Sequence, residues 1–216
     1  MPLKITSTKD AHLEGVKLLI YGASGAGKTV LCSTAPNPLI ISSESGLLSL
    51  AGKDIPVAEI SNERDLKEAY TYAAKSDFDT ICLDSVSDIA ETILAEYKGL
   101  FTDGRQAYGK LNDIMGEYIR KFRDLKGKNV YFTAKEAKVD VNNVVIHQPM
   151  MPGQNLTNSL PYFFDCVIRL EANRKGERKL HTISTATQVC KDRSNRLDKT
   201  EEPNLKVLFD KMTGGQ

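Results

Sequence analysis

The sequence has few cysteines, and their spacing suits neither a disulfide framework nor a zinc site. The chain has no C-x-x-C pair and no histidine set close to a cysteine. The four thiols stand singly in apolar surroundings, at Cys32, Cys82, Cys166 and Cys190. This pattern indicates reduced, buried cysteines in an intracellular protein.

Long apolar runs are also missing. The first fifteen residues contain no continuous apolar segment, and no later run approaches the length that spans a bilayer. We therefore expect a soluble, cytoplasmic protein without a membrane partner.

An excess of charge of one sign is absent too. The 29 Lys and Arg residues against 28 Asp and Glu residues give a net charge of +1. Any nucleic-acid surface must therefore come from local clustering of cations. The 216 residues, 41% hydrophobic and 26% charged, show no internal repeat and no low-complexity tract, which predicts a single globular domain over residues 1–216.

One motif organises the chain, a phosphate-binding loop of the pattern G-x-x-x-x-G-K-[ST]. It is preceded by an apolar strand at residues 16–21 and followed by a helix, as the motif requires. The expected nucleotide-binding residues are Gly22, Ala23, Ser24, Gly25, Ala26, Gly27, Lys28, Thr29 and Val30. In such a loop the backbone N–H groups surround the phosphates, Lys28 reaches the β- and γ-phosphates, and the Thr29 hydroxyl binds Mg²⁺.

Two acidic residues follow apolar strands. Residues 39–41 precede a polar stretch that contains Glu44, and the buried strand at residues 78–83 ends at Asp84. Open α/β sheets bind ligands at the carboxyl ends of their strands. We expect Asp84 beside the Mg²⁺ that accompanies the triphosphate, and Glu44 at the same sheet edge. A solvated acid in a serine-rich turn is the alternative for Glu44.

The remaining pattern predicts an α/β fold with a mostly parallel central sheet flanked by helices and an antiparallel C-terminal extension. Expected helices span residues 61–75, capped by Ser61, 87–97 and 107–125, with a loop at 99–105. Expected strands span residues 55–60 at an edge, 129–134, 163–170 and 180–190. An N-terminal extension (1–15), an inserted segment (135–161) with a hairpin about Asn142 and Asn143, and a mobile tail (212–216) complete the chain.

This order of elements resembles the RecA-type recombinase core over about residues 16–196. The resemblance rests on the phosphate-binding loop, Glu44, the Leu-Asp-Ser-Val sequence at Asp84, and the pair Lys191 and Arg193. It implies an ATPase in which Glu44 activates water and Asp84 holds magnesium. Lys191 and Arg193 would act on the ATP of the neighbouring subunit, so it also implies a ring or filament of identical chains. A solvated strand end is the alternative for this pair.

The chain most resembles the short RecA-like ATPases of bacteriophages, which serve in single-strand annealing and recombination. The sequences at residues 105–109, 152–153 and 161–165 are similar to that subgroup. The resemblance implies single-stranded DNA as a partner, a single-strand-binding protein as a possible second partner, and the host cytoplasm as location. We expect a DNA groove between residues 99–110 and 135–158, with contacts from Arg105, Tyr108 and Lys110; alternatively, Tyr108 packs in the core and the charges are solvated.

The chain also departs from the recombinase pattern. It has room for neither the N-terminal polymerisation segment nor the C-terminal domain of full-length recombinases. The strand at residues 129–134 leads to Lys135 where recombinases usually place a polar amide that senses the γ-phosphate. Lys135 is the candidate substitute, and an exposed strand-end lysine is the alternative.

Three other functions share the phosphate-binding loop. A GTPase is suggested by Asn195–Asp198, which imitates N-K-x-D, but the glycine three residues after Asp84 is missing. A small-molecule kinase would need an arginine-rich lid, and the charged turn at residues 174–179 reads better as a solvated hairpin tip. A non-hydrolysing ATP switch that loads other proteins onto DNA would not need Glu44.

Overall fold

The computed structural model describes residues 15–44 and 47–215. Its strands are β1 Lys17–Gly22, β2 Pro38–Ser42, β3 Val57–Glu59, β4 Thr80–Leu83, β5 Asn129–Val141, β6 Val144–Met150, β7 Cys166–Ala172, β8 Arg178–His181, β9 Lys191–Asp192 and β10 Thr200–Glu201. Its α-helices are α1 Lys28–Cys32, α2 Glu63–Lys75, α3 Val86–Leu100, α4 Gly104–Arg123, α5 Gln154–Ser159 and α6 Leu205–Thr213, with short 3-10 turns at Leu48–Leu50 and Leu160–Phe163.

The strands form one sheet in the order β10-β8-β7-β1-β5-β4-β2-β3, with β6 paired to β5 and β9 paired to β7. The run from β7 to β3 is parallel, whereas β6, β8, β9 and β10 pair in antiparallel fashion. The expected α/β fold with a mostly parallel sheet and an antiparallel C-terminal extension is therefore confirmed. Strand β3 lies at an edge, as its weak apolar pattern predicts.

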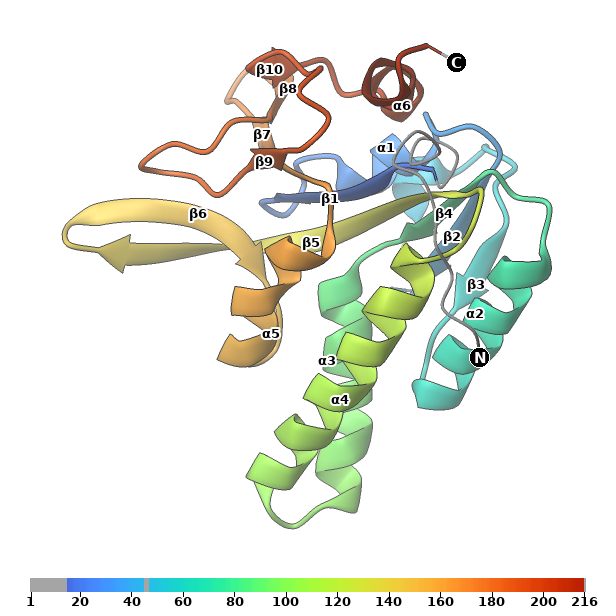
Figure 1. Ribbon diagram of the computed structural model, residues 1–216. Coiled ribbons are helices and arrows are strands. Elements are labelled where there is room, and N and C mark those ends of the chain that lie inside the picture. Colours follow the sequence, from blue (N-terminus) through green and yellow to red (C-terminus); the bar gives the residue numbers. More distant parts are fainter. Residues whose placement is uncertain (1–14, 45–46, 216) are drawn as a thin grey trace, which may run out of the picture.

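Helices cover both faces of the sheet (Figure 1). Alternate residues of β1, such as Leu19 and Tyr21, pack with α2, α3 and α4, and the other residues, such as Leu18 and Ile20, pack with α1 and α6. Strands buried on both faces need continuous apolar runs, which explains the fully buried β1 and β4. Because the parallel strands share one carboxyl edge, the segments after β1, β2 and β4 meet there, beside the part of β5 around Lys135.

Several element boundaries differ from those expected. Helix α2 is capped by Asn62 and not by Ser61, because the Asn62 side chain accepts the Asp65 N–H at 3.0 Å. Helices α3 and α4 leave only a short connection within the expected loop at residues 99–105. Met212 and Thr213, expected in a mobile tail, belong to α6. The expected N-terminal extension lies outside the described residues except for Gly15.

The expected strand at residues 180–190 is wrong beyond His181. Side-chain hydroxyls take backbone partners there: Ser184 Oγ donates to the Cys190 carbonyl at 2.9 Å and accepts the Cys190 N–H at 2.9 Å. Such local bonds compete with a strand ladder. Lys191 therefore begins a separate short strand, β9, which pairs with β7.

The inserted segment extends the sheet. Strand β5 runs past Lys135 and pairs with β6 from Lys135 opposite Met150 to Val141 opposite Val144. Asn142 and Asn143 turn the hairpin with φ of 54° and 63°, as the sequence predicts. Figure 1 shows the hairpin reaching beyond the body of the sheet, with α5 beneath it. No helix in the described part of the chain has the length and apolar character needed to cross a membrane.

Candidate functional site

The phosphate-binding loop connects β1 to α1 at the carboxyl edge of the sheet. Gly25 and Gly27 adopt φ of +75° and +103°, a region that side chains with a Cβ rarely occupy. Gly22 is required for a different reason, since a Cβ there would lie 2.4 Å from the Leu170 carbonyl oxygen of β7. The backbone conformation and packing of the loop thus explain why the motif has glycine at these positions.

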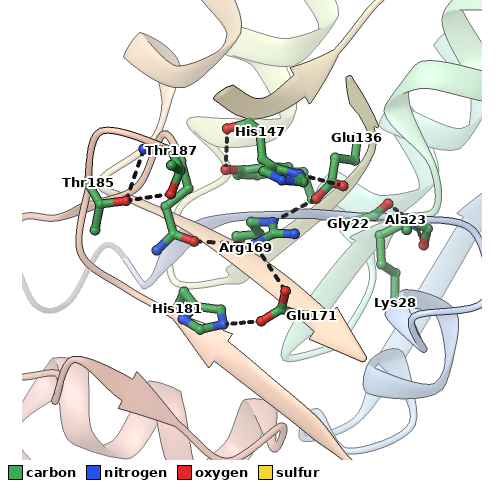
Figure 2. Close-up of polar contacts among 12 residues, drawn as sticks. Gly22, Ala23, Lys28, Glu136, His147, Arg169, Glu171, His181, Thr185 and Thr187 are labelled. Atoms are coloured by element: carbon green, nitrogen blue, oxygen red, sulfur yellow. Dashed lines mark hydrogen bonds and ion pairs between the residues drawn. The ribbon is translucent and has the colours of Figure 1, made fainter. Parts of the chain in front are cut away.

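The Lys28 ammonium lies inside this loop. Its Nζ donates to the carbonyl oxygens of Gly22 at 2.8 Å and Ala23 at 3.0 Å (Figure 2). Burial lowers the pKa of Lys28, and the nearby carboxylates, Asp84 foremost, oppose that shift. The lysine is therefore a desolvated cation held at the loop, where a phosphate can replace backbone carbonyls as its partner.

A cavity of about 470 Å³ opens beside the loop. It is lined by the expected nucleotide-binding residues except Ala23 and Ala26. The other lining residues are Glu44, Ser49, Asp84, Ser85, Asp88, Lys135, Glu136, Met150 and Arg178. The structure thus brings Lys28, Thr29, Glu44 and Asp84 to one cavity, in a size range that suits a small-molecule ligand.

Asp84 follows β4 directly and is only 4% exposed. Its Oδ1 accepts the hydroxyl of the fully buried Thr133 of β5 at 2.6 Å, which fixes the carboxylate toward the cavity. Mg²⁺ at triphosphate sites usually takes one or two protein oxygens, with phosphates and waters as its other ligands. The hydroxyl of Thr29 and the carboxylate of Asp84 fit that requirement.

Glu44 lies just beyond the end of β2, and its N–H bonds to the Ser42 hydroxyl at 3.1 Å. Burial raises the pKa of Glu44, and the negative charges of Asp88 and Asp84 raise it further. Asp88 itself is held by Lys135, whose Nζ lies 2.6 Å from Asp88 Oδ1. A carboxylate with a raised pKa in a polar cavity has the properties of a general base.

Lys135 contacts Glu91 as well, at 2.7 Å, so it is an ion-paired residue of the cavity wall and not a solvated strand end. Burial opposes the charged form of Lys135, but the hydrogen bonds that its ammonium donates to Asp88 and Glu91 outweigh this effect and raise the pKa of Lys135. Lys135 therefore remains charged next to Glu44 and Asp88.

These charges predict how activity should depend on pH. A base works only when deprotonated, so a hydrolysis reaction that used Glu44 as its base would slow as the pH drops through the raised pKa of Glu44. Asp88→Asn removes a neighbouring negative charge and leaves Lys135 in place, so the pKa of Glu44 should fall and the acidic limb of the kcat profile should move to lower pH. Asp77→Asn, an exposed carboxylate outside the cavity, is the control. An acidic limb that stays in place in Asp88→Asn would contradict the assignment of Glu44.

Glu136 borders the same cavity from a network of buried and half-buried charges (Figure 2). Arg169 Nε donates to Glu136 Oε2 at 2.8 Å, and His147 Nδ1 lies 2.9 Å from Glu136 Oε1. Burial would raise the pKa of Glu136, but these two partners outweigh it and lower the pKa. The network continues through Glu171 to His181. It fixes the cavity wall where β5, β6 and β7 meet.

Lys191 and Arg193 do not line this cavity. Lys191 Nζ donates to the Pro161 carbonyl at 2.8 Å, and Arg193 Nη1 lies 3.5 Å from Asp165 Oδ1. Burial lowers the pKa of Lys191, and the positive charge of Arg193 adds to the effect, so the two cations are neighbours. Strand β9 places them near the amino-terminal half of β7, away from the phosphate-binding loop.

The residues expected to contact DNA lie on α4, because this helix begins at Gly104. Arg105 and Lys110 are exposed, and Tyr108 is 37% exposed, with the Lys98 ammonium 5.4 Å from its ring centroid. Tyr108 thus belongs to the surface and not to the core. Its ring faces Gly153, where a Cβ would lie 3.3 Å from Tyr108 Cδ1. This contact joins the two segments of the expected groove.

Asp88, Glu136 and Arg178 line the cavity but are not among the site residues predicted from the sequence. Asp88 had a signal, since Ser85 and Asp88 have the spacing of a helix N-cap, and the Ser85 hydroxyl does bond to Asp88. Glu136 had none, and Arg178 had only its place in the charged turn at residues 174–179, for which the sequence favours a solvated hairpin tip. Both reach the cavity through strand pairings between distant segments.

A protein-family model of the AAA domain matches residues 14–194. No curated protein matches the sequence. The matched region contains the phosphate-binding loop, Glu44 and Asp84, and it covers most of the chain. The chain belongs to the AAA domain family of P-loop ATPases.

Proposed function

We propose that the protein hydrolyses ATP with Mg²⁺ and couples this reaction to single-stranded DNA, as the short recombination and annealing ATPases of bacteriophages do. The position of Glu44 carries the hydrolysis part of the proposal, because a carboxylate with a raised pKa borders the cavity that holds Lys28 and Asp84. A protein that only switches on ATP binding has no need of such a group.

Each group has a distinct part in the proposed reaction. The backbone N–H groups of the loop and Lys28 bind the phosphates and stabilise charge on the transferred phosphoryl group. Thr29 and Asp84 would hold Mg²⁺, which would neutralise charge on the phosphate oxygens. Glu44 accepts a proton from the attacking water while the water oxygen bonds to the γ-phosphorus. The bond from phosphorus to the bridging oxygen breaks, leaving ADP and phosphate.

The DNA part of the proposal rests on the resemblance and on the exposed cations and ring at the start of α4. ATP hydrolysis should rise when single-stranded DNA is added, and this stimulation should weaken steeply with salt. An Arg105→Ala, Lys110→Ala double variant should lose stimulation but keep basal hydrolysis. Lys67→Ala, an exposed cation on α2, is the control. Equal hydrolysis with and without DNA at low salt would contradict DNA coupling.

We also propose that Lys191 and Arg193 serve the ATP of a neighbouring subunit in a ring or filament. Both lie outside the lining of their own cavity, which supports this role, and so does the Arg193 side chain, which is 59% accessible. Cations supplied in trans raise the rate of phosphoryl transfer by on the order of 10³-fold or more in other P-loop enzymes.

A mixing experiment tests action in trans. Lys28→Ala protein keeps its own Lys191 and Arg193, whereas Arg193→Ala protein keeps its own phosphate-binding loop. Each should be nearly inactive alone, and a mixture that co-assembles should recover hydrolysis. Activity in the mixture no greater than the sum of the two separate proteins would show that Arg193 does not act across an interface.

A further inference from the structure

The side chain of Arg178, the first residue of β8, contacts the phosphate-binding loop, although about 150 residues of sequence separate them. Strands β7 and β8 form a hairpin in which Ala172 pairs with Arg178. This hairpin continues past the end of β1, since the β1 pairing with β7 ends at Tyr21 opposite Arg169. The side chain of Arg178 turns back to the loop, and its Nε donates to the Ala26 carbonyl at 3.0 Å.

The guanidinium group lies directly over Gly27. A Cβ at Gly27 would be 2.8 Å from Arg178 Nε and 3.4 Å from Arg178 Cζ. Glycine is therefore needed at this position for two reasons: it leaves room for the Arg178 side chain, and it adopts the positive φ of the loop. The approach places the guanidinium in the wall of the cavity that Lys28 and Thr29 also line.

Most of the hydrogen-bonding capacity of Arg178 is not used by the protein. Within residues 15–44 and 47–215, the guanidinium of Arg178 donates one hydrogen bond, to the Ala26 carbonyl, and forms no ion pair. A guanidinium carries five N–H donors. The hairpin tip is nevertheless ordered by its own bonds, in which the Asn173 side chain binds Glu177 and the backbone closes the turn. The hydrogen-bonded turn thus holds the guanidinium of Arg178 at the cavity, with N–H donors left for a ligand.

The wall of the cavity holds four carboxylates and three cations, and two of these cations are placed to bind an anionic ligand. Lys135, one of three cations in the wall, is already paired with Asp88 and Glu91. Lys28 and Arg178 are the two whose side chains contact backbone carbonyls instead of carboxylates. A nucleoside triphosphate brings several negative charges, and guanidinium binds phosphate oxygens in bidentate fashion.

We infer that Arg178 is a direct ligand of the nucleotide phosphates, supplied by the same chain that supplies the phosphate-binding loop. The inference rests on the proposed nucleotide site and adds to it a residue that acts in cis, distinct from Lys191 and Arg193. The charged turn at residues 174–179, read from the sequence as a solvated tip, thus contributes one residue to the site while Arg174, Lys175 and Lys179 stay outside it.

The test is the Kd of ATP and of GTP with Mg²⁺, measured by isothermal titration calorimetry on the full chain. Arg178→Ala should raise the Kd of ATP about 10- to 100-fold, the range for loss of a charge-assisted hydrogen bond to phosphate. GTP, if bound, should lose affinity by the same factor, because phosphates are common to both. Arg178→Lys should recover part of the affinity. Lys175→Ala removes a cation from the exposed tip of the same turn and should leave the Kd within about 2-fold.

A neutral variant separates phosphate binding from mere support of the loop. Arg178→Gln keeps an N–H donor for Ala26 but carries no charge, so it should bind ATP as weakly as Arg178→Ala. Wild-type affinity in Arg178→Gln or in Arg178→Ala would overturn the inference, and so would a loss confined to one of the two bases. Wild-type protein that binds no ATP would overturn the proposed function itself and this inference with it.

Discussion

Lys28→Ala is expected to lower kcat/KM for ATP by at least about 100-fold, the scale for removing one preorganised group that stabilises transition-state charge. The physical reason is local. Lys28 Nζ is the half-buried cation of the loop, and it donates to the Gly22 and Ala23 carbonyls at the place where phosphate would bind. The measurement is steady-state release of phosphate from ATP with Mg²⁺, together with nucleotide affinity.

Lys53→Ala is a matched control for that substitution. Lys53 also ends in a hydrogen bond, from its Nζ to Ser33 Oγ at 2.7 Å just beyond α1, but it does not line the cavity. Its removal should leave turnover within about 2-fold of the wild type. If Lys28→Ala and Lys53→Ala hydrolysed ATP equally well, the cavity beside the loop would not be the active site.

Glu44→Gln is expected to reduce kcat by about 10²- to 10⁴-fold, the range for loss of a general base, while ATP affinity stays close to that of the wild type. Glutamine keeps the size and polarity of the side chain but cannot accept the proton of the attacking water. Turnover and the Kd of ATP should therefore separate in this variant, whereas Lys28→Ala should affect turnover most and also weaken binding.

Glu59→Gln is the control for the carboxylate. Glu59 ends β3, directly beside β2, where it pairs with Ser42, but it does not line the cavity. The Glu59→Gln protein should hydrolyse ATP like the wild type. An unchanged kcat in Glu44→Gln would make Glu44 a solvated acid of the turn after β2 and would favour a protein that switches on ATP binding.

The sequence was sufficient to predict those parts of the site that depend on a local sequence motif or on the end of a single strand. Gly25 and Gly27 adopt positive φ, which glycine favours, so the motif alone predicts the backbone conformation of the phosphate-binding loop. Glu44 and Asp84 could be predicted because both follow buried parallel strands, and the carboxyl ends of such strands meet at one edge whatever the strand order.

The rest of the cavity depends on pairings that the local pattern does not contain. Arg178 reaches the loop because the β7–β8 hairpin lies next to β1, and no spacing in the sequence relates it to Ala26. The pairing of Lys135 with Asp88 likewise depends on how α3 packs beside β5. The strand expected over residues 180–190 stops at His181 for a different reason, since the Ser184 hydroxyl binds the nearby backbone of Cys190.

The most direct test of a Mg²⁺-dependent ATPase at this cavity is the amount of phosphate that the wild-type protein releases from ATP per protein molecule, with Lys28→Ala protein purified in the same way beside it. We expect release that continues beyond one phosphate per chain, requires Mg²⁺ and falls to the background in Lys28→Ala. Release that equals the Lys28→Ala background, with and without single-stranded DNA, would contradict hydrolysis at this site.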